Sequence, residues 1–123
     1  MDYIDMRLSA IKQKEKSKIS QNEWVEFTKH IWNIPIPNKS DVAYGSHTAI
    51  MPEEIVRRCV RLFTFEGDVV LDPFMGAGSL AVVARDHKRN FLGAEIDEKY
   101  FSIANRRLSG EPDENNSFPN LKT

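Results

Sequence analysis

A glycine-rich stretch in the middle of the chain has the residue types and spacing of a ligand-binding turn. The apolar run 69–71 ends in the carboxylate of Asp72, and the residues that follow are Pro73, Phe74, Met75, Gly76, Ala77, Gly78, Ser79, Leu80 and Ala81. The spacing from position 76 to 81 fits G-x-G-x-x-G/A, in which glycines let the backbone approach a ligand and a small last residue lets helix pack on strand. Because this pattern alone is a weak signal, the neighbouring residues are needed to predict which ligand the turn binds.

A second carboxylate follows in a position that suits a nucleoside. The stretch from Asn90 to Glu95 reads as a short strand, and Glu95 lies 23 residues after Asp72. An acidic residue at the end of the second strand of a βαβ unit accepts hydrogen bonds from ribose hydroxyls. The two strands therefore predict a site for an adenosine-type cofactor.

The charge of Asp72 separates two such cofactors. A dinucleotide such as NAD would place its anionic pyrophosphate at the glycine turn, where this carboxylate would repel it. S-adenosyl-L-methionine (AdoMet) has no phosphate and carries a sulfonium and an ammonium group, which an acidic turn attracts. We therefore expect AdoMet, and NAD is the weaker alternative.

The same residues resemble the AdoMet-binding part of the permuted DNA amino-methyltransferases, which methylate adenine N6 or cytosine N4. The resemblance covers about positions 30 to 108 and is carried by 71–78, 91–97, Tyr100, Ala104 and Arg107, with 46–55 resembling the family's preceding motif. Three positions depart from the family pattern: Thr48 replaces a usual proline, and Ala77 and Leu80 replace residues that are often serine and threonine.

The resemblance implies a set of cofactor-binding residues and no catalytic or metal-binding ones. Asp72 would orient the methionine portion, Glu95 would hold the ribose, and Ile96 and Asp97 would border the adenine. The whole set is His47, Thr48, Ala49, Asp72, Pro73, Phe74, Gly76, Ala77, Gly78, Ser79, Glu95, Ile96 and Asp97.

One family motif is absent from the 123 residues. The resembled enzymes use a tetrapeptide D/N/S-P-P-Y/F/W to hold the flipped target base, and this chain contains no Pro-Pro pair. We therefore expect the chain to be inactive alone and to act on DNA only through a complete enzyme. Either a second polypeptide carrying the tetrapeptide or a homo-oligomer would cover the open edge of the sheet. The alternative is a catalytically silent AdoMet-binding module or structural remnant.

Composition places the chain among single-domain soluble proteins. It has 41% hydrophobic residues, one cysteine and a net charge of −1, and no apolar stretch approaches the length of a membrane span. We expect a cytoplasmic protein without a membrane partner. The charge balance gives no support for autonomous DNA binding.

Three segments are expected. Residues 1–19 read as a flexible basic leader whose lysines at 12, 14, 16 and 18 are solvated, with a phosphate-binding arm as the alternative. Residues 20–109 form the AdoMet-binding part of a methyltransferase domain, and residues 110–123, rich in Pro, Asn, Ser and Glu, form a disordered tail.

The predicted fold class is α/β: a partial Rossmann-like methyltransferase fold, in which a βαβ unit is flanked by helices and the sheet is incomplete. A capping box at Ser20 predicts a helix over 21–31, with Trp24 and Trp32 on its apolar face, and Pro52 opens a helix to about residue 63. On that helix, Arg57, Arg58 and Arg61 are expected to face solvent, with contact to a DNA backbone as the alternative. A last helix is expected over 98–108, capped by Asp97 and stopped by Gly110.

Overall fold

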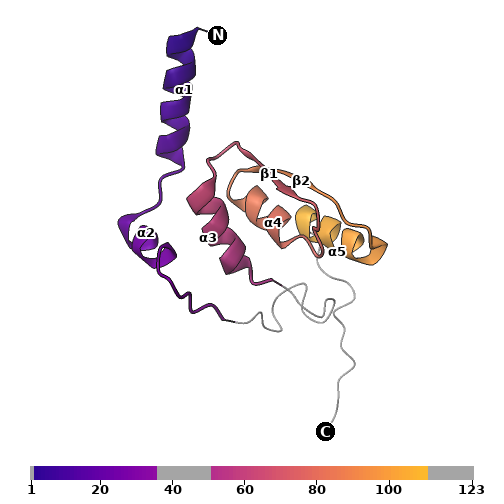
Figure 1. The fold of residues 1–123 in the computed structure, drawn as a ribbon. Coiled ribbons are helices and arrows are strands. Elements are labelled where there is room, and N and C mark those ends of the chain that lie inside the picture. The colour runs from indigo at the N-terminus through magenta and orange to yellow at the C-terminus, as the bar shows by residue number, and fades with distance from the viewer. Residues whose placement is uncertain (1, 36–50, 111–123) are drawn as a thin grey trace.

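The computed structural model describes residues 2–35 and 51–110, which form the helices and strands labelled in Figure 1. The predicted tail lies outside these ranges apart from Gly110. None of the helices within the two ranges is long and apolar enough to cross a membrane. The elements are α1 (Tyr3–Lys16), α2 (Gln21–Phe27), α3 (Glu53–Phe63), β1 (Val69–Asp72), α4 (Ser79–Asp86), β2 (Asn90–Gly93) and α5 (Glu98–Ser109).

The predicted βαβ unit is confirmed. Strands β1 and β2 pair in parallel, with a register that runs from Val69↔Asn90 to Asp72↔Gly93, and helix α4 connects them. Strand β1 has the expected bounds, whereas β2 ends two residues before Glu95. Beyond the end of β2, the Ala94 carbonyl accepts a hydrogen bond from the Met75 N–H, at 2.9 Å, which links it to the turn that follows β1.

The core lies between α4 and the helices on either side of it. Val56 and Val60 of α3 pack against Val83 of α4, with Leu80 at the edge of this cluster. On the α5 side, Ala104 has no exposed surface, and Ile103 packs against Ala77 of the glycine turn. Full burial of one aliphatic side chain contributes about 1.5–3 kcal/mol. This packing fixes the glycine turn between α4 and α5.

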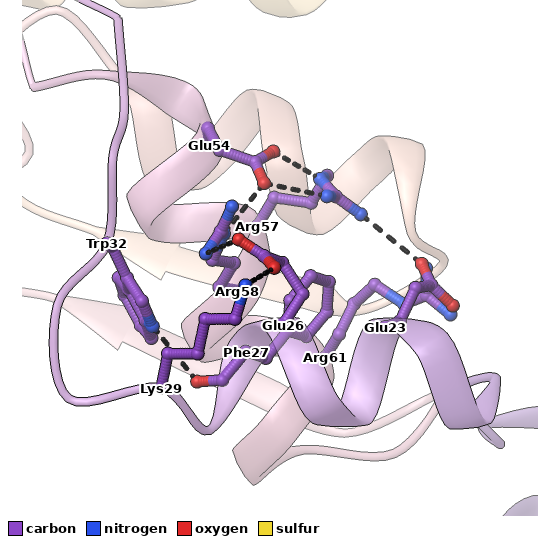
Figure 2. A network of polar contacts seen from close by, with 9 residues as sticks. All are labelled: Glu23, Glu26, Phe27, Lys29, Trp32, Glu54, Arg57, Arg58 and Arg61. Atoms are coloured by element: carbon purple, nitrogen blue, oxygen red, sulfur yellow. Dashed lines mark hydrogen bonds and ion pairs between the residues drawn. The ribbon is translucent and has the colours of Figure 1, made fainter.

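Helix α2 is held on α3 by charged side chains (Figure 2). Glu54 accepts hydrogen bonds from both nitrogens of the Arg57 fork, at 2.6 and 2.8 Å, and from Arg58 Nε, at 2.8 Å. Arg61 donates to Glu23 of α2. The prediction that the three arginines face solvent is wrong, because carboxylates of α2 and α3 surround them and Arg58 is only 6% exposed.

Aromatic rings complete this contact and end α2 early. The Arg58 guanidinium lies 5.3 Å from the Phe27 ring centroid and 5.2 Å from that of Trp32. The Trp32 indole N–H donates to the Phe27 carbonyl at 3.0 Å, which in a longer helix would accept the N–H of residue 31. The helix therefore ends at Phe27 rather than at residue 31. Its apolar face is only partly buried, since Trp24 is 54% exposed.

Residues 3–16 of the predicted leader form helix α1. This helix projects from the rest of the chain as a separate rod and has no buried residue (Figure 1). Asp2 caps its N-terminus, and the Gln13 side chain donates to the Glu66 carbonyl and to Asp68 Oδ1, at 2.9 and 3.1 Å. The capping residue and these polar contacts, rather than an apolar stripe, define α1.

The sheet is incomplete, as predicted. Within the described residues it has two strands, and the face away from α4 carries exposed Val69, Leu71 and Leu92. Each of these side chains is more than 60% exposed. In a doubly wound α/β fold both faces and the central edges of such a sheet are covered. Among the described residues, this face and edge of the sheet are uncovered.

Candidate cofactor site

The turn after β1 takes the shape that its glycines predict. Gly76 and Gly78 have φ angles of +54° and +80°, a region that side-chain-bearing residues rarely adopt. A Cβ on Gly78 would lie 2.8 Å from the Ala104 Cβ of α5. The absence of a side chain therefore brings the start of α4 against α5 and leaves the turn backbone open toward the ends of the strands.

Glu95 joins the two strand ends. Its Oε2 accepts a hydrogen bond from the Gly76 N–H, at 2.7 Å, and its Oε1 accepts one from the Asp97 N–H, at 2.9 Å. The backbone amides of Asp97 and Gly76 lower the pKa of Glu95, so the carboxylate is ionised at neutral pH. The Ile96 amide also stabilises the charged form, and an ionised carboxylate offers about four acceptor positions, so the three amides leave room for a further donor.

Asp72 points into the same turn from β1. Its Oδ1 accepts the Phe74 N–H at 3.0 Å, and its carbonyl accepts the Ala94 N–H at 3.0 Å. Its Oδ2 has no hydrogen-bond partner among the described residues. Two carboxylates thus lie at the carboxyl ends of neighbouring parallel strands, each oriented by backbone amides and each with acceptor capacity left.

Two large apolar side chains beside these carboxylates are almost fully exposed. Phe74 is 89% exposed and Ile96 is 99% exposed. Phe74 lies two residues after Asp72, the last residue of β1, and Ile96 directly follows Glu95. Apolar side chains next to hydrogen-bonding carboxylates can cover a planar, partly apolar ligand while the carboxylates bind its polar groups.

A buried arginine supports the turn from behind, a role for Arg107 that neither the motif nor the resemblance assigned. Arg107 is 8% exposed, and its Nη1 donates to the Ala77 carbonyl at 2.6 Å. Its Nη2 donates to Glu53 Oε1 of α3 at 2.5 Å. The sequence signal was a charge at the helical spacing of buried Ile103 and Ala104.

The structure brings most of the predicted set together. The residues from Asp72 to Ser79 and from Glu95 to Asp97 occupy adjoining turns at one end of the sheet. Asp97 uses its Oδ1 as the predicted N-cap of α5, accepting from the N–H groups of Lys99 and Tyr100 at 2.9 and 3.2 Å. The predicted residues His47, Thr48 and Ala49 lie outside the described residues.

Comparison with protein families matches a model described as DNA methylase, of the N6/N4 type, over residues 2–106. The type II methyltransferase M.BglII of Bacillus subtilis is 53% identical over 77 residues, which are 63% of this chain and 21% of that protein. M.BglI of the same organism is 38% identical over 95 residues, which are 76% of this chain and 26% of that protein. The chain thus spans between a fifth and about a quarter of these relatives.

A solved structure is similar in fold as well as in sequence. The putative DNA modification methylase TTHA0409 of Thermus thermophilus, determined in complex with S-adenosyl-L-methionine, superposes with a TM-score of 0.65 at 33% identity. The superposition covers 80% of this chain and 36% of that one. The likeness therefore includes most of this chain and a third of the longer protein.

Proposed function

The chain belongs to the family of N6/N4 DNA methylases, and from that premise we propose that it forms the AdoMet-binding part of a DNA amino-methyltransferase. The acceptor would be an exocyclic amino group, adenine N6 or cytosine N4. The relatives that support this proposal are type II methyltransferases several times longer than this chain. The activity is accordingly proposed for a complete enzyme of which these residues are one part.

The observation that carries the proposal is the link between Glu95 and the Gly76 N–H, at 2.7 Å. It holds an ionised carboxylate at the mouth of the glycine turn with acceptor positions free for ribose hydroxyls. Asp72 adds a second carboxylate where a dinucleotide would need to place a pyrophosphate. This pair of carboxylate acceptors fits a cofactor with two cationic groups and no phosphate.

In the proposed site each residue binds or orients the cofactor. When bound, AdoMet supplies a methyl group on a sulfonium, which an amino nitrogen attacks directly. Asp72 would hold the cationic methionine portion and Glu95 the ribose, while Phe74 and Ile96 would cover the adenine. Gly76 and Gly78 keep the turn backbone free of side chains that would fill the site. None of these residues accepts a proton from the target amino group.

The catalytic groups would come from a second polypeptide that carries a D/N/S-P-P-Y/F/W tetrapeptide. Exposed Val69 and Leu71 on β1 support this, since an apolar parallel strand with a free edge is unfavourable in water. A second copy of the chain could cover the same edge without adding the tetrapeptide. Only the first arrangement would produce a methyltransferase.

Calorimetry with AdoMet tests the cofactor site. We expect the 123-residue chain to bind AdoMet but not NAD, and the Glu95→Ala variant to lose binding. Glu98→Ala is the matched control, because Glu98 is an exposed carboxylate in the first turn of α5 and lies outside the predicted site. Urea unfolding of each variant separates loss of the site from loss of the fold.

Two results would contradict the proposed cofactor site. Binding of NAD with an affinity similar to that of AdoMet would indicate a dinucleotide site. Equal AdoMet affinity in the Glu95→Ala and Glu98→Ala variants would show that Glu95 does not bind the cofactor. Separately, methylation of DNA by the purified chain without a partner would refute the proposal that a second polypeptide supplies the catalytic groups.

A further inference from the structure

A basic pocket lies at the end of the sheet opposite the cofactor site. It is a cavity of about 220 Å³ lined by the cations Lys16, Lys18, Arg61, Lys88 and Arg89 and by His87, whose pKa burial and the nearby arginines lower. Lys88 and Arg89 directly precede β2, whereas Glu95 follows that strand, so the strand length separates the two sites by roughly 13 Å. The pocket is therefore distinct from the cofactor site.

The chemistry of this basic pocket suits a small, strongly charged anion. Every lining side chain is polar or charged, and the lining holds five lysines and arginines with two carboxylates, Glu66 and Asp86. From outside the lining, Glu15 pairs with Lys18 at 2.8 Å and Glu23 pairs with Arg61. Asp86 is already paired with Arg85 at 2.8 Å, and Glu66 lies 3.8 Å from Lys88. An apolar ligand would find no apolar side chain there.

Two cationic or protonatable groups of the pocket are available to a ligand. Within the described residues, neither Lys16 Nζ nor the His87 ring has a hydrogen-bond or ion-pair partner. By contrast, Arg61 donates to Glu23, and Arg89 donates to the Thr64 carbonyl at 2.7 Å. The two arginines thus supply fixed positive charge, while Lys16 and His87 can still bind an anion.

Lys88 adds an independent observation. It is the only described residue other than glycine with a positive φ angle, +60°, and it follows the C-cap residue of α4. Glycine or asparagine is usual at this position because a Cβ is strained there. A lysine in this conformation places a long cationic side chain at the rim of the pocket, where glycine would avoid the strain.

Helix α1 extends the basic surface beyond the pocket. An open groove of about 660 Å³ runs along α1 and shares Lys16, Glu66 and Lys88 with the pocket, with Lys12 also on its wall. The four lysines of the leader are exposed, as expected, and three of them, Lys12, Lys16 and Lys18, line the groove or the pocket. Side chains of α1 and of the turn before β2, which are far apart in the sequence, therefore lie together on this surface.

We propose that the basic pocket binds a phosphate group. A phosphate oxygen accepts several charge-assisted hydrogen bonds at once, which matches a cavity surrounded by lysine, histidine and arginine donors. The group could belong to a free anion or to a nucleic-acid backbone, since both present the same charged oxygens. The groove beside α1 would accommodate the continuation of a backbone.

An NMR titration of the 15N-labelled chain with inorganic phosphate at constant ionic strength tests this proposal. We expect saturable shifts of the His87 ring and of the Lys88 amide. Lys88→Gly and Lys16→Ala should each weaken phosphate binding roughly ten-fold, the loss typical of one charged hydrogen bond. Lys14→Ala is the matched control, because Lys14 lies in the same last turn of α1 but lines neither cavity.

Lys88→Gly also separates binding from folding, since glycine suits the positive φ angle and should leave the urea midpoint unchanged or higher. Competition by a short DNA duplex would support the proposal and assign a backbone phosphate; phosphate binding without competition would support it and assign a free anion. Absence of saturable phosphate binding would overturn it, as would equal weakening by Lys14→Ala. AdoMet affinity measured in the same samples reports on the other end of the sheet, so failure of either proposal is recognised separately.

Discussion

Gly78 shows how a single missing side chain positions the candidate cofactor turn. Two features oppose a side chain at this position. The φ angle is +80°, and a Cβ on residue 78 would lie only 2.8 Å from the Ala104 Cβ. We expect Gly78→Ala to lower the free energy of unfolding by about 2–5 kcal/mol, the strain of a left-handed alanine plus overpacking. Urea denaturation followed by circular dichroism measures this loss.

The control for this prediction is Gly110→Ala. Gly110 has a similar φ angle, +74°, but a Cβ there would meet no atom within 4 Å. Only the backbone strain, about 1–2 kcal/mol, should remain. Equal losses in the two variants would mean that α5 does not approach the turn as closely as the structure has it.

Arg107 provides the second prediction at the scale of a residue. We expect Arg107→Met to lower the free energy of unfolding by about 2–4 kcal/mol, because the buried Ala77 carbonyl loses its donor and the partly exposed Glu53 carboxylate loses its ion pair. AdoMet affinity should fall as the turn loosens. Arg107→Lys retains the charge but cannot make both bonds in the same geometry. Its free energy of unfolding should therefore lie between those of the wild type and Arg107→Met.

At the scale of elements, the success of sequence reasoning depended on whether the signals were local. Strand β1, the glycine turn and the Asp97 cap were predictable because each is encoded by adjacent residues. Helix α1 was not, because its apolar residues form no stripe and its docking depends on Gln13 reaching a turn 53 residues away. The burial of Arg58 likewise depends on α2 packing across α3.

The same reasoning explains which parts of the site could be predicted. Asp72 and Glu95 were found because parallel strands bring their carboxyl ends to one edge of a sheet. The supporting role of Arg107 required the tertiary contact between α5, the turn and α3. Spacing in the sequence therefore predicted the carboxylates at the strand ends better than the side chain that supports the turn behind them.

The ion pairs of Glu54 within α3 give a pH-dependent prediction. The Arg57 fork, helped by Arg58, lowers the pKa of Glu54 from 4.5 to about 2. A lowered pKa means that this stabilisation is complete above pH 4.5 and is lost as the pH falls toward 2. Because the Glu54 side chain is 31% exposed, screening leaves about 1 kcal/mol.

Glu54→Gln isolates this contribution. The difference in free energy of unfolding between wild type and variant should be present at pH 6 and should shrink between pH 4.5 and 2. Glu15→Gln is the matched control, since the Glu15–Lys18 pair is well exposed, with side chains 59% and 68% accessible. A wild-type minus Glu54→Gln difference that stays constant over this range would show that Glu54 does not titrate with a lowered pKa.

For the molecule as a whole, the open edge of β1 makes the proposed catalytic partner testable. Asp68 and Asp72 direct their carbonyls to β2, accepting from Asn90 and Ala94 at 2.8 and 3.0 Å. Alternation along a parallel pair then directs the Val69 and Leu71 amides away from β2, toward the free edge. Nothing in the described chain protects these two amides from exchange with solvent.

Hydrogen exchange measured by NMR should therefore separate the two edges of β1. In the isolated chain we expect the Leu71 amide to exchange at least ~100-fold faster than that of Val70, which faces β2. Adding a polypeptide that carries the D/N/S-P-P-Y/F/W tetrapeptide should slow the exchange of the Leu71 amide to a rate similar to that of the Val70 amide. Methylation of DNA should appear in the same mixture. Protection of Leu71 that rises with the concentration of this chain alone, without methylation, would instead identify a second copy at the edge, and the proposed partner would be wrong.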